Sequence, residues 1–271
     1  MIAVDQNKVK ALGIDIGSLT TKAVVLDDGK VLASAVILSA DMAELSARSA
    51  AEKALSQAGL DFDGNLHVVT TGAGGKSVPF SQQHKAITTC LARGIYYLFP
   101  TVRMAIDMGA ESMTVIKINE RGRLSDWGNQ DKCAAGTGVF LQQIAKIMQM
   151  PLEQMAKLSL TGRPRADISN TCAVFAESEV ISHIHRLPPT PKEEIIAGIY
   201  LSMVHRVMAL CKRIGIEKDI AATGGVALNS GLVDVLEEEL GFKVLVPDAP
   251  QTVAAIGAAI LAKEGMDKGV K

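Results

Sequence analysis

The chain has 271 residues, of which 48% are hydrophobic and 21% charged, and its formal net charge is −1. This composition predicts a globular protein with a sizeable core, long enough for two lobes. The near-neutral charge gives no reason to expect a nucleic-acid partner or an anionic membrane surface.

The sequence also argues against export and against a disulfide framework. We find no apolar run near the roughly 18 residues of a membrane span, and an acidic residue comes early in the first segment, unlike a secretory signal. We therefore expect a cytoplasmic protein. Its four cysteines are widely scattered, which does not indicate paired disulfides; they are Cys90, Cys133, Cys172 and Cys211.

The first hundred residues predict a small sheet followed by helices. Three strands are expected at residues 10–17, 21–27 and 30–38. A helix at 42–59, a strand at 66–71, a glycine loop at 72–75 and a helix at 84–99 follow. Pro100 ends the last of these helices.

The pattern then restarts. Strands are expected at residues 102–108, 113–119 and 123–127, followed by helix-forming segments after two of the cysteines. The remaining elements are helices at 191–214, 229–240 and 253–263, with strands at 219–223 and 243–246. The alternation of strands and helices predicts an α/β architecture.

A weak internal repeat explains the restart. In both halves an apolar strand ends in Asp-x-Gly, at Asp15–Gly17 and Asp107–Gly109, and a second strand, a polar turn and a third strand follow. Two similar lobes facing each other across a cleft are expected, at residues 1–100 and 101–252. The helix near 253–264 should complete the first lobe.

The first Asp-x-Gly turn has the character of a phosphate site. It offers Gly17, Ser18 and Thr20, with Lys22 closing the segment. Such a tight turn exposes backbone N–H groups to phosphate oxygens, and Asp15 at the strand end can bind hydrated Mg²⁺ or orient water. An ordinary hairpin is the alternative for one copy alone.

The second copy favours the functional interpretation. Asp107, Gly109 and Ala110 repeat the pattern, and the acidic Glu111 follows. Two such turns, one in each lobe, can grip a triphosphate and its metal from both sides. The candidate catalytic residues are therefore Asp15, Asp107 and Glu111. For Glu111 the sequence leaves two interpretations open: it positions the attacking water or the metal, or it only faces solvent.

A third element follows the strand at 219–223. Thr223, Gly224, Gly225 and Val226 let a flat base or ribose approach the backbone. In this order the three elements resemble the acetate kinase–actin–Hsp70 nucleotide-binding superfamily. The resemblance implies a two-lobed, actin-like (ribonuclease H-like) ATPase fold with a nucleotide cleft between duplicated lobes. It also implies ATP or ADP with Mg²⁺, held by the two turns and by an adenosine loop at residues 223–226.

The two remaining cysteine segments point to a metal or redox centre. Cys133 precedes a glycine loop with Gly136 and Thr137, and Cys172 follows three good helix-starting residues. A [4Fe–4S] cluster usually takes four thiolates, so a dimer would supply the other two across its axis. The alternative is that both are buried apolar cysteines, which is our interpretation of Cys90 and Cys211.

These segments resemble the signature of the ATP-dependent electron activators. That family comprises activators of 2-hydroxyacyl-CoA dehydratases and the nucleotide-binding subunits of benzoyl-CoA reductase. The resemblance implies a [4Fe–4S] cluster shared with a second copy or a homologous subunit, loaded by ferredoxin or flavodoxin. It further implies an iron–sulfur reductase or dehydratase partner acting on an acyl-CoA. The resemblance also places Glu177 between the cluster and the nucleotide, which makes it a candidate for coupling them, with helix capping as the alternative.

One departure favours the benzoyl-CoA reductase branch slightly. Dehydratase activators carry Gly-Gln after the second Asp-x-Gly, whereas this chain has Ala110 and Glu111. Two other classes compete with electron transfer. A sugar kinase of the same fold would need a catalytic aspartate and a sugar loop in the first half, and neither is evident. A nucleotide-dependent scaffold would not need Cys133 and Cys172.

Overall fold

The computed structural model describes residues 10–62, 66–130, 137–158 and 162–269, and these group into two compact units. Unit 1 falls within Met1–Val102, Ile118–Ser125 and Gln251–Lys271, and unit 2 within Arg103–Lys117 and Asp126–Pro250.

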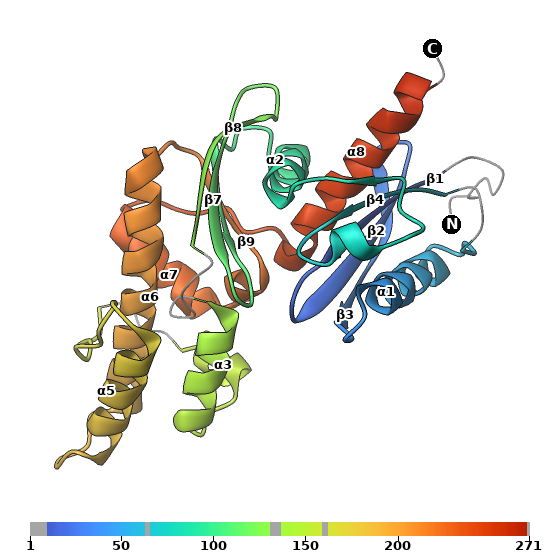
Figure 1. Cartoon of the computed structure of the whole chain (residues 1–271). Helices are drawn as coiled ribbons and strands as arrows, with labels where there is room; N and C mark the ends of the chain where they lie inside the picture. Colours follow the sequence, from blue (N-terminus) through green and yellow to red (C-terminus); the bar gives the residue numbers. More distant parts are fainter. Residues whose placement is uncertain (1–9, 63–65, 131–136, 159–161, 270–271) are drawn as a thin grey trace. The chain divides into compact units, whose positions relative to one another are not determined.

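Unit 1 is built on a five-stranded sheet in the order β3-β2-β1-β4-β5 (Figure 1). The strands are β1 (Lys10–Ile16), β2 (Thr20–Asp27), β3 (Lys30–Leu38), β4 (Leu66–Thr71) and β5 (Gln83–His84). β1 runs antiparallel to β2 and parallel to β4. The first four strands are confirmed where the sequence predicts them.

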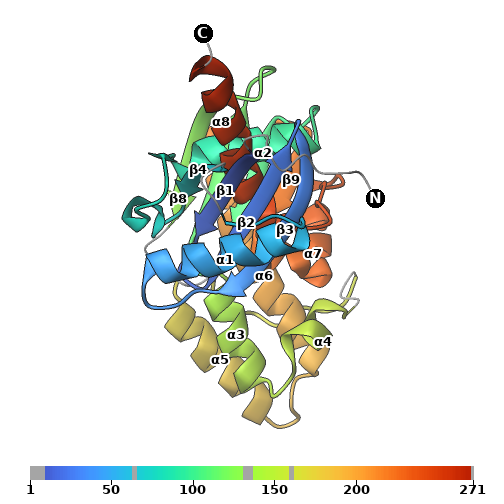
Figure 2. The same ribbon diagram turned by 90° about the vertical axis from the view of Figure 1, so that its right-hand side faces the viewer.

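Helices cover both faces of this sheet (Figure 2). The helices are α1 (Ala43–Gln57), α2 (Ile87–Leu98) and α8 (Val253–Gly269), with a short 3-10 turn, η1 (Gly75–Ser77). Leu12 and Ile14 of β1 pack with the alanines of α1, whereas Ala11 packs with α8. This division follows from the alternation of side chains along a strand.

The start of α2 differs from the prediction. A helix was expected from His84, but Gln83 and His84 pair in parallel with β4, and the N–H of Lys85 donates to the carbonyl of Thr70 at 2.9 Å. Pairing with the sheet holds these residues extended, so the helix begins only at Ile87.

The second sheet repeats the order of the first, β8-β7-β6-β9 (Figure 1). Its strands are β6 (Met104–Met108), β7 (Met113–Ile118), β8 (Leu124–Gln130) and β9 (Ile220–Thr223). β6 runs antiparallel to β7 and parallel to β9, as β1 does to β2 and β4. The internal repeat seen in the sequence is thus a repeat of sheet topology.

The strand predicted at residues 243–246 is wrong. Only Leu245 forms a bridge, to Ala221 of β9. The N–H of Val244 donates instead to the Glu237 carboxylate at 2.8 Å. Pro247 has no N–H, so pairing with a strand cannot extend beyond it.

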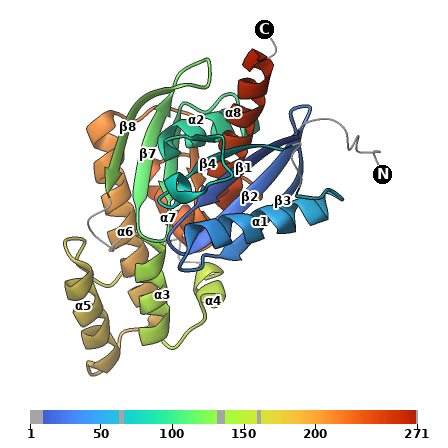
Figure 3. The same ribbon diagram turned by 45° about the vertical axis from the view of Figure 1, so that its right-hand side comes forward.

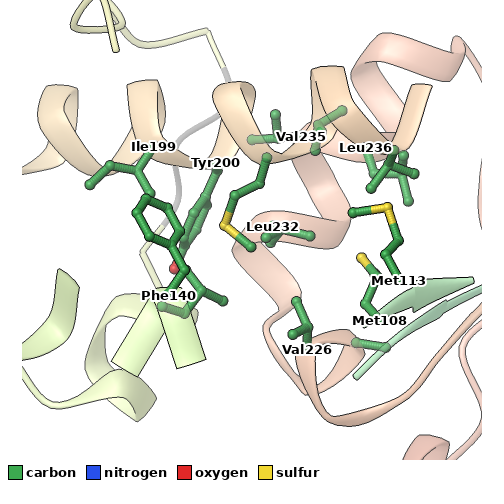
Figure 4. Close-up of a cluster of buried hydrophobic side chains, with 14 of the residues drawn as sticks. Met108, Met113, Phe140, Ile199, Tyr200, Val226, Leu232, Val235 and Leu236 are labelled. Carbon is green, nitrogen blue, oxygen red and sulfur yellow. The ribbon is translucent and has the colours of Figure 1, made fainter. Parts of the chain in front are cut away.

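The helices of unit 2 are α3 (Gly138–Ile147), α4 (Leu152–Ala156), α5 (Ala173–His185), α6 (Lys192–Ile214) and α7 (Ser230–Leu240). Two further 3-10 turns, η2 (Gly225–Leu228) and η3 (Pro250–Thr252), precede α7 and α8. Figure 4 shows the core of this unit, where Tyr200 and Leu232 lie between Phe140 and the methionines Met108 and Met113. The methionines fill the core.

By length and composition α6 reaches the size of a membrane span, contrary to our expectation. It has 23 residues and a mean hydropathy of 1.4 over an 18-residue window, and 78% of that window is buried within the protein. Burial of this extent is also found in the core helices of soluble proteins.

Candidate functional site

The first Asp-x-Gly turn is closed by a hydrogen bond from the N–H of Gly17 to the carbonyl of Thr20, at 3.1 Å. Asp15 lies opposite Lys22 in the β1–β2 register, and the Lys22 Nζ is 3.2 Å from the Asp15 Oδ2. Asp15 is only 6% exposed, so the ammonium compensates a carboxylate that has little access to water. Ser18 is exposed in this turn.

Ser39 supports this turn, and sequence reasoning missed it. Its Oγ donates to the Gly17 carbonyl at 2.8 Å and lies 2.9 Å from the Thr21 Oγ1. Its N–H donates to the Leu19 carbonyl at 3.0 Å. Ser39 directly follows β3, which pairs with β2, so only the sheet register brings it to the turn.

The second turn has the same backbone form, and a hydroxyl group of the neighbouring strand reaches its carboxylate. The N–H of Gly109 donates to the Ser112 carbonyl at 2.8 Å. Asp107 faces Thr114 in the register where Asp15 faces Lys22. Its Oδ1 accepts a hydrogen bond of 2.9 Å from the Thr223 Oγ1 on β9. A neutral hydroxyl therefore orients this carboxylate.

The residues after Asp107 are accessible to solvent. Gly109 and Ala110 are partly exposed, and Glu111 is exposed in the turn. The exposure of Glu111 is compatible with both interpretations made from the sequence, contact with water or metal and simple solvation.

Each sheet continues into a Thr-Gly pair beside its Asp-x-Gly turn. Gly224 has φ +85°, and a Cβ there would overlap the Met108 carbonyl. Gly72 has φ +83°, and a Cβ there would lie 2.5 Å from both the Ile16 carbonyl oxygen and the Asp15 Oδ1. Only glycine fits either position.

Sequence reasoning singled out Thr223 to Val226 but treated residues 72–75 as a plain loop. The sequence signal for this correspondence is the Thr-Gly pair that occurs at the end of β4 and again at the end of β9. Gly225 is exposed beside Gly224, as a residue approached by a ligand would be.

Of the two cysteine segments, Cys133 and Gly136 lie outside the described residues. Thr137, which is 1% exposed, is the N-cap of α3. Cys172 is the N-cap of α5, as the sequence predicts, and is partly exposed. Within the described ranges no three His, Cys, Asp or Glu side chains group in a way that could hold a metal ion.

The other cysteines behave as core residues, confirming that prediction. Cys90 and Cys211 are both fully buried. Burial raises the pKa of each thiol to about 12, which keeps them protonated at neutral pH.

The segment before Cys172 is held from two helices. The N–H of Ser169 donates to the Glu179 carboxylate of α5, and its carbonyl accepts from the Ser202 Oγ of α6 at 2.8 Å. Glu179 thus fixes the chain leading into α5. Glu177 is half-buried on the same helix.

Comparison with known proteins identifies the family. The model of the BadF/BadG/BcrA/BcrD ATPase family matches residues 12–262. The chain belongs to this ATPase family. It is 40% identical to the activator of lactoyl-CoA dehydratase from Anaerotignum propionicum, over 95% of this chain and 98% of the relative.

Solved structures support the same assignment. The activator of the 2-hydroxyisocaproyl-CoA dehydratase from Clostridium difficile, solved with bound ADPNP, matches with a TM-score of 0.87 and 37% identity. That match covers 96% of this chain and 97% of the activator. A ROK family glucokinase from Streptomyces griseus shares the fold alone, with a TM-score of 0.55 and 14% identity. The expected actin-like ATPase fold is confirmed.

The slight preference for the benzoyl-CoA reductase branch is not supported. A benzoyl-CoA reductase subunit from Thauera aromatica is 34% identical over 76% of this chain and 74% of the relative. The dehydratase activators match with higher identity over nearly their whole length. The comparisons favour the alternative, and Ala110 and Glu111 do not outweigh the similarity of the whole chain.

Proposed function

We propose that this family member is the activator of a 2-hydroxyacyl-CoA dehydratase, using ATP hydrolysis to deliver low-potential electrons to that partner. The observation that carries the proposal is the similarity to the lactoyl-CoA dehydratase activator, which extends over 95% of this chain and 98% of the relative.

We assign the nucleotide to the two Asp-x-Gly turns. The first turn, with Lys22, and the second turn would offer the phosphates a cation and those N–H groups that do not close the turns themselves. Asp15 and Asp107, at the ends of the two strands, are the carboxylates that we assign to hydrated Mg²⁺ and to the attacking water. Thr223 positions the Asp107 carboxylate through its hydrogen bond. The glycines after Thr223 let the adenosine approach the backbone.

The cysteine segments fit a shared iron–sulfur cluster. Cys172 is partly exposed at the N-terminus of α5, where free N–H groups and the helix dipole favour a negative charge. Cys133 and Cys172 together would supply two of the four thiolates, and a second copy or a homologous subunit the other two. The cluster would supply a one-electron redox centre, loaded by ferredoxin or flavodoxin.

The nucleotide and the electron have to be coupled for such an activator to work. ATP turnover would change the conformation of the cysteine-bearing helices, dock the activator on its partner and favour transfer in one direction. The chemistry on the acyl-CoA would occur in the partner.

The test is an anaerobic purification followed by iron, sulfide and ATPase measurements. We expect about four iron atoms per pair of chains. Cys172→Ala should lose the iron and retain nucleotide binding. Cys211→Ala, which changes a buried cysteine of the same unit, is the matched control and should retain both. An iron-free wild-type protein would remove the proposal.

A reconstituted assay distinguishes the two branches. The purified protein, ATP and a low-potential reductant are added to an inactive 2-hydroxyacyl-CoA dehydratase or to the catalytic subunits of a benzoyl-CoA reductase. Activation of the first alone agrees with the proposal, and activation of the second alone would overturn it.

A further inference from the structure

The start of α3 is hydrogen-bonded to the second Asp-x-Gly turn. The N–H of Gly138 donates to the Gly109 carbonyl, and the N–H of Val139 donates to the Ala110 carbonyl, both at 2.9 Å. The first N–H groups of a helix have no partner within the helix. In α3 two of them are satisfied by the turn that we assign to phosphate binding.

Gly138 also lies in van der Waals contact with this turn. A Cβ at Gly138 would lie 3.4 Å from the Ala110 Cα and from the Gly109 carbonyl oxygen, and 3.6 Å from the Val226 Cγ2. Val226 belongs to η2, directly after Gly225. The first turn of α3 is therefore bonded to the Asp107 turn and lies close to Val226 of the second nucleotide element assigned in unit 2.

At the same time α3 is linked to the cysteine-bearing segments. α3 and α5 pack side by side near one end of α6 (Figures 1 and 3). Cys172 is the N-cap of α5, and the chain before it is fixed through Ser169. In the sequence Cys133 precedes Gly138 by five residues.

We propose that the N–H groups of Gly138 and Val139 position α3 on the Asp107 turn and transmit nucleotide occupancy from that turn to the segment around Cys172. This inference rests on the proposed function, since it assumes a nucleotide at the turn. If a phosphate shifts the Gly109 and Ala110 carbonyls, α3 must follow them or leave two helix-terminal N–H groups unsatisfied.

A proline at Gly138 isolates the contact. Gly138 is the first residue of α3, a position where proline fits because no hydrogen bond within the helix uses the N–H of that residue. Thr137 has φ −115° and ψ 169°, a conformation compatible with a following proline. Gly138→Pro thus removes the donor to Gly109 and replaces its hydrogen by a ring methylene.

The matched control is Gly138→Ala. It retains the N–H, and its Cβ would meet only ordinary van der Waals neighbours. Val139→Pro removes the neighbouring hydrogen bond and replaces Gly138→Pro in the test if that variant does not fold.

The measurement is amide hydrogen exchange on the full chain, with and without ADP or ADPNP, on peptides covering residues 137–147 and 169–176. In the wild type and in Gly138→Ala we expect nucleotide to slow exchange in both peptides about fivefold, the value of one net hydrogen bond. In Gly138→Pro the nucleotide should still bind, but the response of both peptides should be lost.

An unchanged response in a nucleotide-binding Gly138→Pro variant would overturn the inference, as would a wild-type protein whose two peptides do not respond. Iron content measured on the same preparations keeps the proposed function separate. An iron-free wild type whose peptides respond to nucleotide would remove the cluster and leave the contact supported.

Discussion

Replacing Thr223 by valine tests whether a neutral hydroxyl orients the second catalytic carboxylate. Thr223 is fully buried on β9, and valine has nearly the same shape and suits a strand. The substitution removes the hydrogen bond to the Asp107 Oδ1. A hydrogen bond to a charged group contributes about 1.5–3 kcal/mol. If all of it acts in the transition state, the rate falls about ten- to hundredfold.

We expect the lower end of this range. Asp107 is partly exposed, so water replaces part of the lost bond. The assay is steady-state ATP hydrolysis, with an expected loss of about tenfold in kcat. Nucleotide affinity should change little, because the substitution alters only the Thr223 side chain, which orients Asp107, and leaves the backbone of the adenosine loop in place.

The internal repeat provides the control. Thr71 occupies the equivalent position beside Asp15, but its hydroxyl donates to the Lys85 carbonyl at 2.9 Å. Thr71→Val should therefore lose about 0.5–1.5 kcal/mol of stability, measured by urea unfolding, and keep its kcat. A Thr223→Val variant with wild-type kcat, or equal losses of kcat in both variants, would refute the assignment.

Three further outcomes are expected. Gly257→Ala should destabilise unit 1 by about 3 kcal/mol or more in urea unfolding, because its Cβ would overlap the backbone carbonyl of Cys90. The control is Gly265→Ala in the same helix, which should cost little because its Cβ would meet only the end of a side chain. Equal stabilities of the two variants would contradict this prediction. In the iron-free protein, iodoacetamide should modify Cys172 well before Cys90, because Cys90 is buried and burial raises its pKa to about 12. Mass spectrometry of the modified peptides gives the order, and earlier modification of Cys90 would contradict the prediction. Burial and the nearby charge of Lys76 lower the pKa of His84 below its usual 6.5. Below pH 6.5 the unfolded chain therefore binds a proton that the folded chain does not, and the stability of the protein should fall as the pH drops toward the lower pKa of the folded state. A His84→Gln variant should lose this part of the pH dependence.

Local patterns were sufficient for most elements of this fold. The apolar strands before Asp15 and Asp107 were predictable because each is a short buried run that ends at a glycine turn. α5 was predictable from the helix-starting residues ahead of Cys172. The errors lie where pairing outside the segment decides the conformation. His84 pairs with β4 instead of starting a helix. The N–H of Val244 is taken by the Glu237 carboxylate, seven residues earlier in the chain, instead of by a strand.

The sequence by itself determined the two Asp-x-Gly turns, the cysteine at the start of α5 and the duplicated order of strands. These depend on residue types that are close in the chain. Only the tertiary structure decided how the turns are supported. Thr223 reaches Asp107 across parallel strands, and the start of α3 satisfies its N–H groups on the second turn. Such contacts join residues far apart in the chain, and the register of the sheets and the packing of the helices fix them, so no local pattern in the sequence encodes them.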